Sequence, residues 1–104
     1  MFELRMEITK TRRKLLDKSV SYIIDKINDC GYSIHDISIL YNKHYSYPNS
    51  YYVCFINIEF ENKILTDYDY IQSSSISKLT YFLSHINKFA DISEMQIKEI
   101  NQKG

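Results

Sequence analysis

Residues 51–71 read YYVCFINIEFENKILTDYDYI, and they decide the fold because apolar and polar side chains alternate on both sides of a polar turn. Alternation with a period of two is typical of half-buried strands. One face of the first arm carries only apolar side chains: Tyr52, Cys54, Ile56, Ile58 and Phe60. The stretch therefore predicts an antiparallel hairpin with this face in the core.

The register of the hairpin follows from the cost of burying charge. A two-residue turn would place Asp67 opposite Ile58 inside the core, where an unpaired carboxylate is costly. A three-residue loop over 62–64 shifts the pairing by one residue, so that Ile58 meets Tyr68 instead. We predict this register, which puts Glu59 opposite Asp67 on the outer face.

Two helices are predicted outside the hairpin by apolar residues at steps of three and four. Thr9 or Thr11 is expected to cap the first helix, and Gly31 to end it. One serine of 73–75 is expected to cap the second. The inner stripes are Leu16, Val20, Ile23, Ile24 and Ile27 in the first helix, and Ile76, Leu79, Leu83, Ile86 and Ala90 in the second.

Two terminal segments are less determined. Residues 2–8 alternate as a strand does, with Phe2, Leu4, Met6 and Ile8 on one face, but they include good helix formers. Residues 93–101 fit a strand or a short helix, and 37–41 fit a short strand. We predict one α+β domain over 1–104, in the order (β)αβββα followed by a strand or short helix. Its antiparallel sheet of three to five strands packs two main helices on one face.

Composition narrows the functional class. The chain has 104 residues and no net charge, which argues against disorder and against a uniformly basic nucleic-acid binder. Ten tyrosines and a single alanine indicate a low-GC source. Cys30 and Cys54 are expected to be reduced core thiols. No apolar stretch suits a signal peptide or a membrane span, so a soluble, cytoplasmic protein is expected.

An acidic outer surface is predicted from the hairpin, made of Glu59, Glu61, Asp67 and Asp69. Like charges opposite each other destabilise a sheet, so they indicate selection for something other than stability. A solvated face is the plainer interpretation. The expected partner is a protein with a basic surface, of which a nucleic-acid-binding host protein is one candidate. A homodimer is also left open.

The stretch LYNKHYSYPNSYY, residues 40–52, is interpreted as a tyrosine-rich loop. Tyrosine offers a large contact area with few rotatable bonds, which suits a binding surface. We expect Tyr41 and Tyr52 to be buried. Tyr45, Tyr47 and Tyr51 are expected to be exposed and to bind a protein.

A basic cluster lies at the start of the first helix and comprises Lys10, Arg12, Arg13 and Lys14. Together with the tyrosine-rich loop it supports the alternative function, an accessory protein that binds nucleic acid. The plainer interpretation is a solvated helix face.

Enzymatic signatures are weak. Glu61-Asn62-Lys63 has the spacing of a nuclease element, and Glu59, Asp67 and Asp69 would complete a metal-dependent nuclease as the third hypothesis. That spacing is common by chance, and two glycines leave no room for a phosphate-binding loop. We predict no enzyme, no cofactor and no metal.

In size and charge character the chain is similar in kind to small phage-encoded inhibitors of host defences, including anti-CRISPR proteins. This likeness rests on no motif and assigns no residue. It implies a non-enzymatic protein-binding module, encoded by a phage or mobile element, that inhibits a host system.

Overall fold

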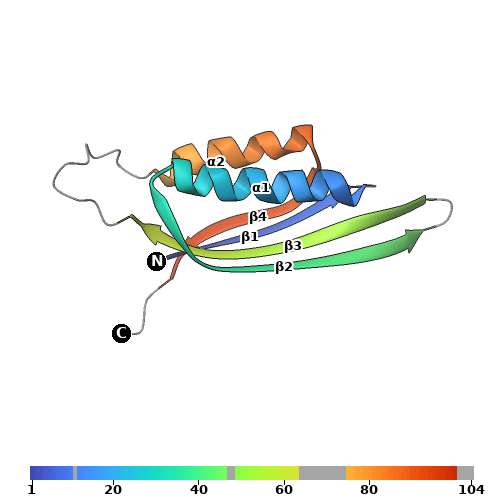
Figure 1. Ribbon diagram of the computed structural model, residues 1–104, viewed down its shortest axis with the longest axis horizontal. Coiled ribbons are helices and arrows are strands. Elements are labelled where there is room, and N and C mark those ends of the chain that lie inside the picture. The colour runs from blue at the N-terminus through green and yellow to red at the C-terminus, as the bar shows by residue number, and fades with distance from the viewer. Residues whose placement is uncertain (11, 47–48, 64–74, 101–104) are drawn as a thin grey trace.

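The computed structural model describes residues 1–10, 12–46, 49–63 and 75–100. Its elements run along the chain as β1 (Phe2–Lys10), α1 (Arg13–Asp29), β2 (Tyr32–Ser46), β3 (Asn49–Asn62), α2 (Ile76–Ser84), a short 3-10 helix η1 (His85–Lys88) and β4 (Asp91–Glu99). Figure 1 shows both helices on one face of the sheet, with the other face open. The predicted α+β class is confirmed.

The described strands form one antiparallel sheet in the order β2-β3-β1-β4. Each half of the chain crosses over one face through a helix, which is the split βαβ or ferredoxin-like arrangement. Both terminal segments that the sequence left open are strands. The N-terminal strand lies inside the sheet and β4 lies at its edge.

The inner face of β1 confirms the predicted alternation, because Leu4 and Ile8 are fully buried and Met6 is 3% exposed. These side chains meet the predicted core face of β3, with Leu4 opposite Ile58 and Met6 opposite Ile56. Packing between such cross-strand pairs is the main stabilising contact within a sheet.

The predicted hairpin register is wrong. β3 has β1 along one edge and β2 along the other, so Ile58 lies between Leu4 and Ile37 and has no free edge for Tyr68. The physical reason is that β1 offers four apolar inner-face residues, Phe2, Leu4, Met6 and Ile8, which pair with the core face of β3. Residues 64–74, which include the predicted second arm, lie outside the described residues.

Helix α1 buries the predicted stripe, and its Leu16, Ile23 and Ile27 are fully buried. The helix ends as expected at Gly31, whose φ of 89° is accessible to glycine at little cost. The predicted cap is wrong for Thr9, because β1 continues through Lys10 and the cap position is Arg12, without a side-chain hydrogen bond. Thr11 lies outside the described residues.

Helix α2 begins as predicted at a serine cap, where the Ser75 hydroxyl accepts a hydrogen bond from the Lys78 backbone N–H. Leu79 and Leu83 are fully buried, and the continuation to Ile86 is a 3-10 turn instead of the predicted α-helix. No helix among the described residues is long and apolar enough to cross a membrane.

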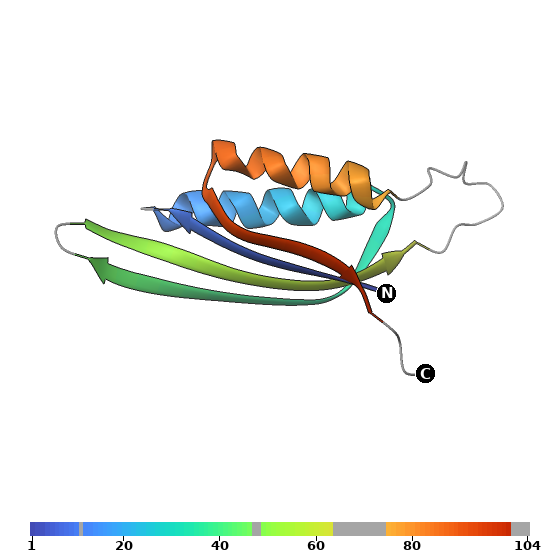
Figure 2. The same ribbon diagram turned by 180° about the vertical axis from the view of Figure 1, so that it is seen from behind.

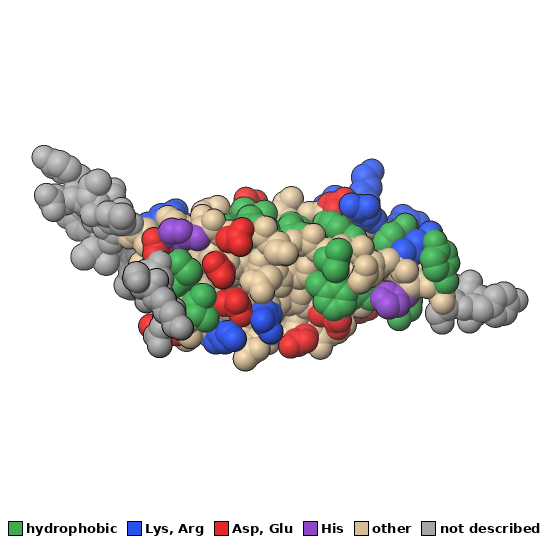
Figure 3. Space-filling view, turned by 90° about the horizontal axis from the view of Figure 1, so that it is seen from below, with side chains coloured by type: hydrophobic (Ala, Val, Ile, Leu, Met, Phe, Trp, Pro, Cys, Tyr) green, Lys and Arg blue, Asp and Glu red, His purple; other side chains and the backbone are tan. Residues whose placement is uncertain are grey.

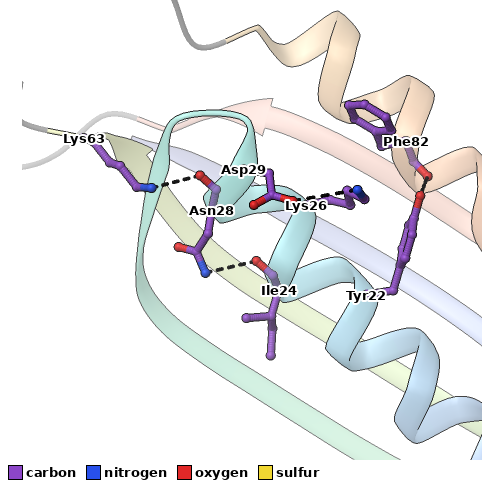
Figure 4. Close-up of polar contacts among 7 residues, drawn as sticks. All are labelled: Tyr22, Ile24, Lys26, Asn28, Asp29, Lys63 and Phe82. Atoms are coloured by element: carbon purple, nitrogen blue, oxygen red, sulfur yellow. Dashed lines mark hydrogen bonds and ion pairs between the residues drawn. The ribbon is translucent and has the colours of Figure 1, made fainter. Parts of the chain in front are cut away.

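Three hydrogen bonds tie the helical layer together and to the end of β3, and Figure 4 shows two of them. The Tyr22 hydroxyl of α1 donates a hydrogen bond of 3.1 Å to the Phe82 carbonyl of α2. Lys63, just past β3, donates from Nζ to the Asn28 carbonyl at 2.9 Å, and its backbone N–H donates to Gly31. The last turn of α1 and the end of β3 are therefore fixed to each other.

The strands β2 and β3 are much longer than predicted and continue past the helices (Figures 1 and 2). We call their outer part, residues 42–46 and 49–53, the arm. The predicted tyrosine-rich loop is therefore wrong for most of its length, because only residues 47 and 48 separate the strands and these lie outside the description. Tyrosine favours strands, so the same residues that suggested a surface loop extend the hairpin.

Candidate functional site

The open face of the sheet, called here the outer face, carries an apolar pair that breaks its polar character. Leu40 of β2 lies opposite Phe55 of β3, and their side chains are 58% and 38% exposed. Val53, two residues along β3, is buried. A sheet face in contact with water normally carries polar side chains, so this pair requires an explanation. We call Leu40, Val53 and Phe55 the apolar patch.

Beside the apolar patch lies a hollow of about 350 Å³. Its rim is polar and is formed by Arg5, Glu7, Ser38, Asn57 and Glu94, which come from all four strands. An apolar centre with a polar rim is the usual composition of a protein–protein interface.

A row of three carboxylates crosses the outer face on the other side of Asn57. Asp36 of β2 is opposite Glu59 of β3, which is opposite Glu3 of β1. We call these residues the acidic row. Figure 3 views this face and shows acidic side chains gathered towards one end, with an apolar cluster nearer the other end.

The acidic surface predicted from the sequence is thus assembled from other residues. Glu59 and Glu61 lie in β3 as expected, but the neighbours of Glu59 are Asp36 and Glu3, so its predicted pairing with Asp67 is wrong. Asp67 and Asp69 lie outside the described residues. Only the topology brings Glu3 to Glu59, because the two are far apart in sequence.

Two acidic side chains of this face, Glu3 and Glu61, have partners. Glu3, whose side chain is only 13% exposed, forms ion pairs with Arg5 at 3.1 Å and Lys98 at 3.6 Å. Its Oε1 has no aligned hydrogen bond, so these contacts are chiefly electrostatic. Glu61 contacts His35 Nε2 at 2.6 Å, where the register of β2 shifts between Ile34 and Asp36. None of these three contacts involves Asp36 or Glu59.

The exposed tyrosines do not form one surface. Tyr45 is 82% exposed and lies on the same face as the helices, whereas Tyr51 is 37% exposed and lies on the outer face. The Tyr51 ring stacks on His44, with ring centroids 5.3 Å apart. Tyr47 lies outside the described residues. Tyr41 and Tyr52 pack against the core and are partly buried, close to the prediction.

The basic cluster is close to the arm. Lys10 ends β1, Arg12 precedes α1, and Arg13 and Lys14 are in its first turn. The Arg13 guanidinium lies 4.3 Å from the centre of the Tyr41 ring, and Tyr41 donates a hydrogen bond of 2.7 Å to Asp17. Burial and this hydrogen bond both raise the pKa of Tyr41. The two sequence features of the alternative hypothesis therefore meet at one end of the molecule.

The remaining chemical groups are the lysine of the nuclease-like spacing and two thiols. Within the described ranges no set of three or more His, Cys, Asp or Glu side chains could hold a metal ion. Lys63, the lysine of the nuclease-like spacing, is bound to the end of α1. Cys30 and Cys54 are free and buried, and burial raises the pKa of the Cys54 thiol to about 11, so it is protonated at neutral pH.

Comparison with known proteins identifies a fold and no family. No family model and no curated protein matches the sequence. A DUF3240 family protein from Shewanella baltica OS155 has a similar structure, with a TM-score of 0.52 and 15% sequence identity over 99% of this chain and 93% of that one. This likeness shows the fold alone.

Two other solved structures are less similar. The C-terminal domain of the MgtC protein from Mycobacterium tuberculosis has a TM-score of 0.47 and 7% identity, over 93% of this chain and 83% of that chain. The de novo designed protein Foldit4 has a TM-score of 0.40 and 6% identity, over 96% of this chain and 98% of that chain.

Proposed function

We propose that the chain is a small, non-enzymatic module that binds another protein through the outer face of its sheet. The observation that carries this proposal is the apolar patch, where Leu40 and Phe55 are exposed side by side on the face opposite to α1 and α2. Exposed apolar clusters rimmed by polar groups are typical of interaction sites.

The acidic row supports a partner with a basic surface. Asp36 and Glu59 remain next to each other without a cation of their own among the described residues, which favours an incoming positive charge. Complementary charge mainly determines partner choice and the rate of encounter, whereas the buried apolar contact supplies most of the affinity. The patch and the row would therefore have different roles in one interface.

The proposed partner is a basic protein of the kind that itself binds nucleic acid. Inhibition of a host system by a phage or mobile-element product stays a prediction from size and charge, and the solved structures that resemble this chain do not bear on it. The proposal about the outer face is independent of that origin.

Affinity capture from a low-GC bacterial lysate, with and without nuclease, tests the proposal. The wild-type chain is expected to retain a protein after nuclease treatment. Leu40→Glu should lose that protein, because it places a charge at the centre of the apolar contact. The matched control is Tyr81→Glu, since Tyr81 is 60% exposed on α2, in the other layer. Equal capture by all three chains would refute the proposal.

The other possible occupant of the outer face is a second copy of the chain. Sedimentation of the purified chain tests for it. If the wild type is a dimer and Leu40→Glu is a monomer, the partner is a second copy of the chain, and the proposal of a basic partner is wrong. A monomeric wild type is expected.

A further inference from the structure

The inner face of the arm, on the same side of the sheet as the helices, gathers positive charge and aromatic rings. Lys43 and Tyr45 of β2 lie on it, together with Tyr52 of β3, and Lys10 of β1 is opposite Tyr52. Because β2 and β3 extend past α1 and α2, neither of these helices covers this part of the sheet (Figures 1 and 2). With Arg12, Arg13 and Lys14 at the start of α1, we call these residues the basic arm surface.

Contacts between cations and rings organise this surface. Lys43 Nζ lies 5.1 Å from the centre of the Tyr45 ring and 5.5 Å from that of Tyr52. A cation held near ring faces keeps its charge and remains available to an anion. Tyr45 is 82% exposed, so most of its ring is in contact with solvent although its backbone is fixed in a strand.

Within the described residues, no carboxylate forms an ion pair with the cations of this surface, which are Lys10, Arg12, Arg13, Lys14 and Lys43. Asp17, the first carboxylate along α1, accepts the hydrogen bond of Tyr41. Asp91 shares a hollow of about 430 Å³ with Lys10 but makes no ion pair with it.

We propose that the basic arm surface binds single-stranded nucleic acid. Sites for single strands combine a positively charged track for the phosphates with aromatic rings on which bases stack, and this surface has both. Tyr45 is the stacking ring, because it is the exposed one. Lys43 and the cations at the start of α1 contact the phosphates. The bound nucleic acid therefore runs from the arm towards the start of α1.

This surface is separate from the proposed protein-binding face. Tyr45 and Lys43 lie on the inner face of the sheet and Leu40 on the outer face, so the two sites are tested independently. An acidic peptide would meet the same cations, but it would gain little from an exposed ring. The effect of removing that ring therefore discriminates between the two ligands.

Fluorescence anisotropy with a labelled oligothymidylate about twelve nucleotides long, within the usual range of single-strand sites, measures the binding. Tyr45→Ala should weaken binding by about 5- to 150-fold, the range measured for loss of one stacked base. Tyr45→Phe should bind like the wild type, since it keeps the ring. The control Tyr81→Ala removes another exposed ring, 60% exposed, from α2 and should have no effect.

The salt dependence tests the phosphate contacts. The slope of log K against log salt should fall in magnitude by about 0.7 for Lys43→Gln, the value for one phosphate contact with a single strand. Lys78→Gln is the matched control, because Lys78 is an exposed lysine of α2 that also lies near a ring. Leu40→Glu should bind the oligonucleotide as the wild type does.

Three results would overturn the inference. The first is the absence of oligothymidylate binding at low salt. The second is equal affinity for the single strand and for the corresponding duplex, combined with no effect of Tyr45→Ala. That combination would indicate a site that binds any polyanion. The third is equal competition by polyglutamate at matched charge, which assigns the surface to acidic proteins. Thermal melts of each variant confirm that it is folded before binding is compared.

Discussion

Replacing Glu59 with lysine is expected to stabilise the protein, because Glu59 lies between two carboxylates. Its neighbours across the strands are Asp36 on one side and Glu3 on the other. Side chains that lie directly opposite in an antiparallel sheet have Cβ atoms about 4.5–5.5 Å apart, and like charges at that separation repel. Lysine would convert both repulsive pairs into attractive ones.

The size of the expected gain in stability follows from the surroundings of Asp36 and Glu3. A cross-strand pair contributes about 0.2–1 kcal/mol, and exposed ion pairs fall at the lower end. Glu3 already has Arg5 at 3.1 Å and Lys98 at 3.6 Å, so little repulsion remains on that side. Asp36 has no such cation among the described residues. We therefore expect a gain of about 0.5–1 kcal/mol, mainly from Asp36, which corresponds to a rise in Tm of about 2–8 °C.

Thermal unfolding followed by circular dichroism measures this gain. Asn57→Lys is the matched control, because it adds the same side chain to the same strand but opposite Arg5 and Ser38. That variant should be no more stable than the wild type. High salt should reduce the difference between the two lysine variants, since charges at the surface are then screened.

The result that would refute the reasoning is equal stability of the two lysine variants at low salt. In that case the acidic row would not be under repulsion, and its charge would be no indication of selection for binding. Capture of the basic partner is expected to weaken in Glu59→Lys although the protein is more stable. Stability and binding would then change in opposite directions in one variant.

The remaining predictions concern the fold. Ser75→Ala should lower the free energy of unfolding by about 1 kcal/mol in urea titrations, because the Lys78 N–H loses its acceptor, and an unchanged value would contradict the cap. Gly31→Ala should cost about 1–2 kcal/mol, since alanine is strained at a φ of 89°, whereas Gly31→Asn should cost less. Burial raises the Cys54 pKa from 9.0 to about 11, so its stabilising contribution is complete below pH 9 and is lost as the pH rises through 11. Cys54→Ala should therefore lose less stability than the wild type between pH 9 and 11, and parallel curves would contradict this assignment.

The helices and the buried faces could be predicted from the sequence because periodicity is a local property. The steps of three and four that place Leu16 and Ile23 on one stripe are visible without any knowledge of the partner strands. The same holds for the alternation of Leu4 and Ile8, and for Gly31, whose lack of a side chain matches its positive φ.

The pairing of the strands could not be predicted in this way. Alternation in β3 determines which side chains face the core, but it contains no information about which strand lies along each edge. The carboxylate that meets Glu59 comes from Glu3, more than fifty residues away, so the acidic row has no signature in either segment alone. The arm could have been found, because the tyrosines at 41, 45, 51 and 52 favour strands on both sides of the turn predicted at Pro48.

The zero net charge of the chain conceals a separation of charge that only the fold creates. The acidic row lies on the outer face of the sheet, whereas Lys43 and Lys10 lie on the inner face near the start of α1. Fields at a protein surface depend on local groups more than on the total, because screening limits each to about 10 Å at moderate salt. Composition therefore argues only against a uniformly basic binder and not against a local basic site. The two proposed sites are on opposite faces, so a basic protein and a nucleic acid bound there would not compete for the same residues. Because they share no side chains, the effects of Leu40→Glu and Tyr45→Ala on their respective ligands should be independent of each other.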